Sequence, residues 1–430
     1  MTSLLWSLFV LIVPAPAGDA PASATPAAPG SLGGQGLALL ASKALTVPPE
    51  GPQFVNDAVL LVRDGKIEAV GSAREVAVPA DYEVRDVGEN WLMPGLVDLH
   101  AHIAGQSFMV NDINDMVFLT NPELRASSAV VPENPNLLRG VAGGVTTVLF
   151  IPGSGTNMGG QGVLLKTALD TYEEMEIRNP GSLKLAQAGN PERWLIGPGR
   201  SFMNWNTRNT FLRGLAYAKR WQAYEKGEGE KPEKDLQFEV FRDLLEKKTQ
   251  VSTHTQIYQV VLMTIEMVRR DFGLDVYIDH GSFDGWKVAG LAEEAGVPAI
   301  LGPREISRHY TNFNDTDGKI LGMASQYQKA GHTMIGFNTD SPIVPEEELS
   351  LQAAMGVRYG MDNSRLEHVR GLTIVPAITA GIEDRVGSLE PGKDADVLVV
   401  SGDPADPRTS VESVYIEGQH VYDAALERRW

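Results

Sequence analysis

Residues 91–103 read WLMPGLVDLHAHI, an almost entirely apolar stretch that ends in two histidines separated by one residue. On a β-strand, residues i and i+2 project to the same side. We therefore expect His100 and His102 to present their imidazoles together, with Ala101 turned away. Neutral imidazoles are good ligands for Zn²⁺. The pair therefore predicts a metal site at the end of a buried strand; two hydrogen-bonded core histidines are the alternative.

The whole chain has 430 residues, more than a single hydrophobic core usually holds, so one large domain and a smaller one are expected. Its 43% hydrophobic and 21% charged residues are typical of a globular protein. The net charge of −18 argues against a nucleic-acid partner, because binding to phosphates depends on cationic side chains. A small-molecule substrate is compatible with this charge, since the local charge of a site can oppose the global one.

Both ends of the chain carry short apolar or alternating runs that are typical of β-strands. Residues 57–71 read DAVLLVRDGKIEAVG, with a hairpin signal at RDGK, and residues 411–423 read VESVYIEGQHVYD, with a glycine-containing turn. We expect residues 37–92 and residues 381–430 to form a single small β-sandwich together.

The middle of the chain, residues 93–380, alternates apolar strands with helical stretches. Such alternation predicts a parallel sheet, and this length fits a (β/α)₈ barrel of the TIM type, so the chain is assigned to the α/β class. In such barrels the chemistry sits at the C-terminal ends of the strands. His254, His280 and Asp340 each end an apolar run there, at spacings of about one and two βα units. The spacing predicts candidate ligands on strands 1, 5, 6 and 8.

The N-terminus is expected to direct export. Residues 1–17 contain a short apolar run followed by a small-x-small pattern, which predicts a cleaved signal peptide, and residues 18–36 are rich in Ala, Pro and Gly, which predicts a disordered linker. The chain has no cysteine, which is compatible with any redox compartment. We therefore expect a periplasmic or secreted protein without a membrane span after cleavage.

Six stretches of this sequence together resemble the metal-dependent amidohydrolase superfamily, in its imidazolonepropionase-like branch: PGLVDLHAHI, GGVTTV, STHTQ, IDHG, NTDSP and GSLEPGKDADVLVVSGDP. The resemblance covers roughly residues 55–421. It implies a (β/α)₈ barrel with a composite β-sandwich, and one or two divalent ions, usually zinc.

The resemblance also assigns residues. His100, His102, His254 and Asp340 match the core metal ligands, and His280 matches the fourth histidine. In binuclear members a carbamylated lysine on the fourth strand bridges the two ions, and Lys184 in SLKLAQAG stands in the matching place. The family pattern carries a glutamate soon after this lysine, where this chain has Gly189, so the number of ions stays open.

The expected chemistry is hydrolysis of a C–N bond in an amide, a cyclic amide or a dipeptide-like substrate. A bound ion makes hydroxide available near neutral pH, and Asp340 can act as general base and then general acid. His280 would bind a second ion or stabilise the oxyanion. A deaminase of the same superfamily is the nearest alternative, and an exported, non-catalytic metal- or ligand-binding protein is an alternative from another class.

Loops after the strands are expected to select the substrate. Tyr258, Arg304 and His309 are candidates at the mouth of the barrel. Arg200 belongs to an arginine- and aromatic-rich stretch that could bind a carboxylate or could equally be a packing or interface loop. The glycine-rich residues 151–166 are expected to form a loop near the site. His368, away from the strand ends, is expected at the surface. The chain could form a homo-oligomer.

Overall fold

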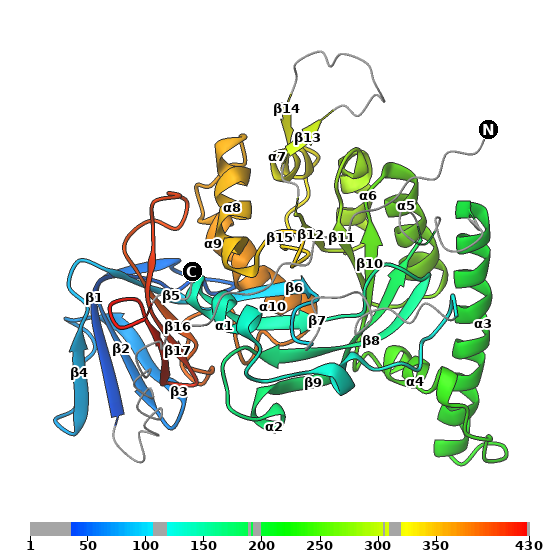
Figure 1. Ribbon diagram of the computed structural model, residues 1–430, viewed down its shortest axis with the longest axis horizontal. Helices are drawn as coiled ribbons and strands as arrows, with labels where there is room; N and C mark the ends of the chain where they lie inside the picture. The colour runs from blue at the N-terminus through cyan, green and yellow to red at the C-terminus, as the bar shows by residue number, and fades with distance from the viewer. Residues whose placement is uncertain are drawn as a thin grey trace, which may run out of the picture.

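A computed structural model of the chain describes residues 36–105, 118–187, 191, 199–303, 306–308 and 320–427. The predicted signal peptide and nearly all of the predicted linker lie outside these residues. Within them are two eight-stranded sheets and a two-stranded hairpin. In Figure 1 the sheet built from the chain ends lies to one side of the barrel, and helix α3 (Gly199–Glu225) lies at the opposite edge.

The first sheet combines both ends of the chain, as the sequence predicts, and forms the composite β-sandwich. Its strand order is β18-β17-β16-β5-β1-β2-β3, with β4 paired to β1. Alternate residues of β1 pack into two different apolar clusters, Leu37 and Leu39 in one and Ala38 in the other, so both faces of the sheet are covered. The strands are β1 (Gly36–Leu45), β2 (Phe54–Arg63), β3 (Lys66–Ser72), β4 (Tyr82–Asp86), β5 (Trp91–Pro94), β16 (Val397–Val400), β17 (Val411–Ile416) and β18 (Gln419–Asp423).

The second sheet is the barrel, with strands in the order β6-β7-β8-β9-β10-β11-β12-β15. A parallel bridge between Ala101 and Ser341 joins the first strand to the segment after the last, which brings the two edges of the sheet together. The (β/α)₈-type barrel that the sequence predicts is therefore present. Its strands are β6 (Leu96–Ala101), β7 (Val145–Phe150), β8 (Met158–Lys166), β9 (Glu176–Ala186), β10 (Val251–Thr255), β11 (Val276–His280), β12 (Ala299–Leu301) and β15 (Ile335–Phe337).

The third barrel strand differs from the expectation. β8 pairs antiparallel with both β7 and β9, whereas the other neighbours in the barrel are parallel. The glycine-rich residues 151–166, expected to be a loop, form a loop only before Met158 and then this strand. Its glycines are required by close packing: a side chain on Gly162 would stand 2.6 Å from the Ile151 side chain and 2.9 Å from the Phe150 carbonyl.

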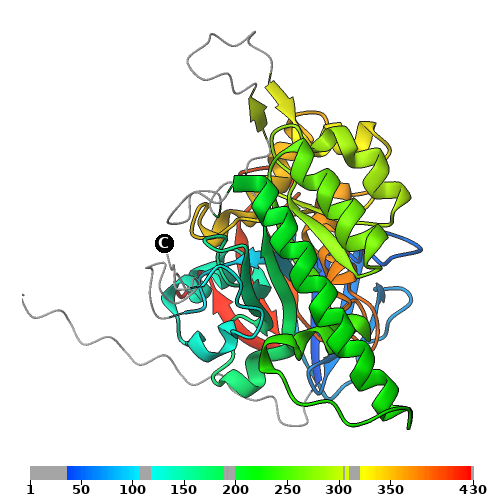
Figure 2. The ribbon, with the colours of Figure 1, turned by 90° about the vertical axis from the view of Figure 1, so that its right-hand side faces the viewer.

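Helices follow most of the barrel strands and cover the outside of the barrel, with α3 running along the face turned to the viewer in Figure 2. Helix α1 begins where Asn134 caps Asn136 N and Pro135 occupies the first turn. The helices are α1 (Pro135–Ala142), α2 (Tyr172–Met175), α3, α4 (Val240–Leu245), α5 (Tyr258–Met263), α6 (Ala289–Glu294), α7 (Met323–Lys329), α8 (Leu349–Arg358), α9 (Glu367–Leu372) and α10 (Ile374–Ala380). A π-helical stretch, Thr264–Asp271, extends α5. The hairpin consists of β13 (Ile306–Arg308) and β14 (Ile320–Gly322). None of the described helices is both long and apolar enough to cross a bilayer.

The junction between the two sheets is tight. β5 belongs to the chain-end sheet and β6 to the barrel, with only Gly95 between them. A side chain on Gly95 would stand 2.0 Å from Thr146 Oγ1, so the short turn requires glycine. Completely buried Lys166 of β8 adds an ionic connection: its Nζ lies 3.0 Å from Asp394 Oδ2 and 2.5 Å from Asp396 Oδ2. The chain-end sheet is thereby held against the barrel that carries the site.

Candidate metal centre

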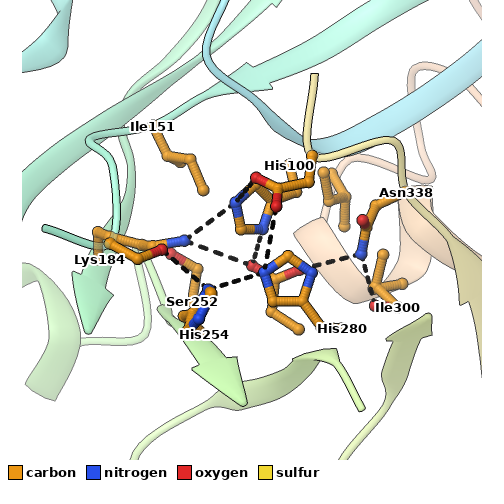
Figure 3. A network of polar contacts seen from close by, with 12 residues as sticks. His100, Ile151, Lys184, Ser252, His254, His280, Ile300 and Asn338 are labelled. Atoms are coloured by element: carbon orange, nitrogen blue, oxygen red, sulfur yellow. Dashed lines mark hydrogen bonds and ion pairs between the residues drawn. The ribbon is translucent and has the colours of Figure 1, made fainter. Parts of the chain in front are cut away.

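The candidate ligands lie at the C-terminal ends of barrel strands, and Figure 3 shows His100, Lys184, His254 and His280 pointing toward one another. His100 is on β6, His254 on β10 and His280 at the end of β11, and all three are buried. His102 follows β6, and Asp340 follows β15. His100, His280 and Asp340 each offer one ligand atom, and these atoms lie within 4.8 Å of one another. Residues that are separated by whole βα units in the sequence therefore lie close together in the folded barrel.

Three of the histidines are oriented by a hydrogen bond from Nδ1. Carbonyl oxygens can only accept, so Nδ1–H of His102 donates to Ile151 O and Nδ1–H of His280 donates to Gly302 O, both at 2.8 Å. Nδ1 of His100 bonds to the carboxylate of Asp279. Such partners are typical of metal-binding histidines, because they fix the tautomer and direct the other nitrogen toward the ion.

The remaining nitrogens of these rings converge. His100 Nε2 lies 3.1 Å from His102 Nε2, and His280 Nε2 lies 2.8 Å from His254 Nδ1. Asp340 Oδ1 is 3.1 Å from His100 Nε2 and 3.3 Å from His102 Nε2. Acceptor atoms this close repel one another unless a proton or a cation lies between them. Imidazole nitrogens and a carboxylate also form the donor set that suits Zn²⁺, so the residues present fit a divalent ion.

The pKa shifts of the four histidines indicate that the centre favours a positive charge but holds few protons. Burial, followed by the effect of His100, lowers the pKa of His280 to about 4. Burial also lowers the pKa of His102 and brings that of His254 well below its usual value. For His100, burial is outweighed by the carboxylates of Asp279 and Asp340, which raise its pKa. The surroundings of His100 thus favour a positive charge at this point, which a metal ion could supply instead of a proton.

Asp340 is ionised at neutral pH. Burial opposes its ionisation, but the charge of His100 and hydrogen bonds with His100 and His102 hold its pKa well below the usual range. Its Oδ2 lies 4.0 Å from His280 Nε2, and 15% of its side chain is exposed. The carboxylate is therefore not completely shielded from solvent.

Lys184 lies on β9, the fourth strand of the barrel, as the sequence predicts. Its Nζ lies 3.2 Å from His100 Nε2 and 3.7 Å from Asp279 Oδ2, and the side chain is completely buried. Burial lowers the pKa of Lys184 despite the nearby carboxylates of Asp279 and Asp340. The structure thus brings all six predicted ligands together, while their roles as ligands stay a prediction.

Two of the six have a backbone conformation that sequence does not reveal. His280 has φ of 75° and Asp340 has φ of 51°, in the left-handed region that non-glycine residues rarely adopt. The unusual turn at the end of β11 lets His280 reach the same centre as Asp279, although neighbours on a regular strand point to opposite sides. Backbone strain of this kind is concentrated at functional sites.

Two contributors to the centre were missed. Asp279 bonds to His100 Nδ1 and accepts a hydrogen bond from Asn338 Nδ2 at 3.2 Å. It precedes His280 directly in the sequence, and adjacent residues on a strand are expected to point to opposite sides, so it was not predicted to reach the centre. Ser154 Oγ, from the loop before β8, lies 2.8 Å from His254 Nδ1. The glycine-rich loop was expected near the site, but nothing in its sequence distinguishes this serine.

Of the three predicted substrate-binding residues, the structure describes only Tyr258. Tyr258 begins α5 directly after β10, is 38% exposed, and donates from its backbone nitrogen to Asp284 Oδ1. Arg304 and His309 lie outside the described residues, as does Gly189. The surface position expected for His368 is wrong: the side chain is completely buried, with Nδ1 2.6 Å from Asn363 Oδ1.

Comparisons with known proteins agree with this fold. The model of the Amidohydrolase family matches residues 305–421. The crystal structure of an amidohydrolase from Thermotoga maritima superposes with a TM-score of 0.78 and is 31% identical in sequence, over 90% of this chain and 100% of that one.

Curated relatives point the same way. Amidohydrolase tasK of Hapsidospora irregularis is 25% identical over 409 residues, which cover 85% of this chain and 40% of tasK, so this chain spans less than half of that protein. The imidazolonepropionase of Brucella anthropi is 27% identical over 378 residues, which cover 81% of this chain and 88% of that protein. With the barrel, the composite β-sandwich and the clustered histidines described above, the likeness to the Thermotoga protein along its whole length shows that the chain belongs to the amidohydrolase superfamily.

Proposed function

We propose that this protein is a divalent-metal-dependent hydrolase that cleaves a C–N bond in an amide, a cyclic amide or a dipeptide-like substrate. The observation that carries the proposal is the convergence of His100, His280 and Asp340 within 4.8 Å. His102, His254 and Lys184 surround them as further ligands. When bound, an ion such as Zn²⁺ supplies Lewis acidity: it acidifies water and polarises a carbonyl group.

Asp340 is proposed to transfer a proton from the attacking water to the leaving nitrogen. Its carboxylate is ionised and partly exposed, so it can accept a proton from the attacking water and pass it to the leaving nitrogen.

His280 is better suited to binding an ion than to donating a hydrogen bond to an oxyanion. Its Nδ1–H is engaged by the Gly302 carbonyl, and its pKa of about 4 leaves Nε2 without a proton at neutral pH. An oxyanion requires a donor, whereas an ion requires a lone pair. Of the two roles considered for His280, we therefore propose the ligand.

The test is turnover by metal-free and metal-reloaded protein. The chain is stripped with a chelator, dialysed, and reloaded with Zn²⁺, Mn²⁺ or Co²⁺, then assayed with dipeptides, N-acyl amino acids and lactams. We expect release of an amine together with a carboxylate that is lost on stripping and restored on reloading. Release of ammonia from an amidine would identify a deaminase instead. No turnover with any ion would contradict both enzymes and favour a binding protein.

We also propose that the protein is exported to the periplasm or secreted, on the strength of the signal pattern in residues 1–17. Expression of the full chain in a Gram-negative host, followed by fractionation and N-terminal sequencing, tests this. We expect a processed chain that begins after Ala17 in the exported fraction. An unprocessed chain confined to the cytoplasm would contradict export.

A further inference from the structure

An apolar stripe runs along the outer side of helix α3. Phe202, Trp205 and Leu212 are 42%, 58% and 56% exposed, and Ala216 is exposed on the same side of the helix. In Figure 1 the helix lies at the edge of the molecule, and in Figure 2 its outer side faces the viewer without any element in front of it. Large apolar side chains that share one exposed face are typical of a protein contact site.

The spacing of the stripe is that of a helix which packs against another helix. Its positions follow one another in steps of three and four residues, and each of them is exposed or half-buried. They are Phe202, Trp205, Asn209, Leu212, Ala216 and Lys219. Met203, Phe211 and Tyr217, on the other side of the helix, are buried. Alternating steps of three and four residues form the seam of a coiled coil, so the stripe is a seam without a second helix in the described chain.

Side-chain size along the stripe indicates what the second helix is. Bulky Phe202 and Trp205 occupy the N-terminal half, and small Ala216 lies in the C-terminal half. An identical stripe that runs antiparallel, as a two-fold axis across the helix requires, places each bulky residue opposite a smaller or more flexible one. The pairs are then Phe202–Lys219, Trp205–Ala216 and Asn209–Leu212. A parallel pair would instead set tryptophan against tryptophan and leave a gap between the alanines.

The charges of α3 fit the same antiparallel arrangement. Lys219 and Arg220 lie toward its C-terminal end, and the rings of Phe202 and Trp205, with centroids 5.5 Å apart, lie toward its N-terminal end. Antiparallel pairing brings the cations of one copy to the aromatic rings of the other, which is an attractive contact. The net charge of −18 makes two copies repel each other, so a surface that carries cations favours their association.

A groove beside the stripe offers room for the tryptophan of a second copy. It has a volume of about 1070 Å³ and lies between α3 and the segment that precedes α4. Arg213, Ala216 and Arg220 line one side, and Leu236, which is 68% exposed, lines the other. Ala216 is the residue that Trp205 of the second copy would meet, so the indole can enter this groove. Tryptophan that fills a groove of its partner is a frequent anchor of protein interfaces.

The area that such a pair would bury reaches what a stable dimer needs. From Phe202 to Lys219 the stripe is about 26 Å long, and the helix together with the groove beside it is about 23 Å wide. Each copy would therefore contribute roughly 600 Å², and the pair would bury roughly 1,200 Å², which is the lower limit for a specific and stable interface.

We propose that α3 and the groove beside it form the interface of a symmetric homodimer, in which two α3 helices pack antiparallel. Trp205 is the anchor and enters the groove of the other copy. The dimer is independent of the proposed hydrolytic activity, because none of the candidate metal ligands belongs to this interface.

The experiment is sedimentation velocity of the purified full chain across the micromolar range. Trp205→Ala and Ala216→Trp change the size of the side chain at one contact in opposite senses, and the double variant exchanges the two residues. Both positions are exposed, so folding should be unchanged, which thermal unfolding checks.

Two matched controls change the same kinds of residue elsewhere. Phe54→Ala removes an aromatic side chain that is 49% exposed on β2 of the chain-end sheet. Ala330→Trp places a tryptophan at an exposed alanine that ends α7. Both controls should dimerise as the wild type does.

We expect the wild type to dimerise and each single variant to weaken the dimer at least about 30-fold. Trp205→Ala removes the anchor, and Ala216→Trp sets two indoles against each other. The double variant should recover most of the affinity, because the exchange restores one large and one small residue at each contact.

Cross-linking tests the orientation of the two helices. The chain has no cysteine, so a single introduced thiol is the only one present. A mixture of Phe202→Cys and Lys219→Cys chains should be linked by a short thiol-specific cross-linker. Neither variant by itself should be linked, because the two copies of one position lie about 26 Å apart in an antiparallel pair.

A monomeric wild type would assign the stripe to a partner other than a second copy and would overturn the proposal. A dimer that persists in both single variants would place the interface elsewhere on the surface. Failure of the double variant to recover, or linking of the Phe202→Cys chain to itself, would overturn the antiparallel pairing.

Discussion

The side-chain nitrogen of Lys184 lies 3.2 Å from Nε2 of His100, and both side chains are completely buried. Burial lowers the pKa of Lys184, which favours the neutral amine. A neutral amine can react with carbon dioxide, and the resulting carbamate is an anionic ligand of the kind that the sequence resemblance implies. The same surroundings that disfavour a lysine cation would thus favour its use in a metal site.

Two completely buried lysines on neighbouring strands should respond differently to replacement by methionine. Lys166→Met leaves buried Asp396 without its cation, while Asp394 keeps Lys66 and Arg385 as partners, so the free energy of unfolding should fall by about 3 kcal/mol. Burial shifts Lys184 toward its neutral form, so Lys184→Met should change the stability of the metal-free protein less, by under about 1.5 kcal/mol.

Urea denaturation of the two metal-free variants measures this contrast, and metal analysis of the reloaded proteins completes it. Lys184→Met should bind less metal than the wild type does. Equal destabilisation by both replacements, or an unchanged metal content in Lys184→Met, would show that Lys184 is a structural cation.

Asp340→Asn should abolish turnover while the protein keeps much of its metal. The amide cannot accept the proton from water, and proton transfer of this kind contributes about 10²- to 10⁴-fold to a rate. Steady-state kinetics with the best substrate of the panel, together with metal analysis, checks it. Asp271→Asn is the control, since Asp271 lies in an exposed pair with Arg208. Turnover near the wild-type rate in Asp340→Asn would remove this residue from the mechanism.

Glu346→Gln should change how stability depends on pH. Burial, followed by the charge of Asp98, raises the pKa of Glu346 well above its usual value, and burial raises that of Asp98 to about 7. Thr339 Oγ1 lies 2.6 Å from Asp98 Oδ2 and 3.3 Å from Glu346 Oε2, and its one hydrogen cannot serve two carboxylates. A proton on the folded acid pair resolves this conflict.

The sign of the effect follows from these raised values. The unfolded chain releases the proton of Glu346 near pH 4.5, whereas the folded chain retains it, so wild-type stability falls as pH rises above that value, by at most about 1.4 kcal/mol per pH unit for one proton. Glutamine does not titrate. The unfolding free energy of Glu346→Gln minus that of the wild type should therefore increase between pH 5 and pH 8 in urea denaturation. A difference that is constant with pH would mean that Glu346 is ionised in the folded protein.

Much of the barrel and its centre could be predicted because the relevant signals are local and periodic. The pattern of WLMPGLVDLHAHI already indicates a strand with two same-sided histidines, and the spacing of His254, His280 and Asp340 follows the length of βα units. The composite β-sandwich follows from the similar β-rich character of the two chain ends.

What could not be predicted depends on contacts between distant segments. The antiparallel direction of β8 is set by pairing with β7 and β9. Asp279 belongs to the centre because the left-handed φ of His280 lets two adjacent residues face one point. Burial of His368 is compatible with its polar partners Asn363 and Asp403. The surface prediction used only the distance of His368 from the strand ends in the sequence, which does not reveal these partners.

His100, His280 and Asp340 are proposed to hold a divalent ion, and the metal content of the purified protein tests this most closely. Inductively coupled plasma mass spectrometry is applied to wild-type protein and His100→Ala after reloading with Zn²⁺ and removal of excess metal. We expect at least one ion per wild-type chain and a large loss of metal in the variant, together with loss of hydrolysis. A wild-type chain that retains no ion, or a variant that retains as much as the wild type, would contradict it.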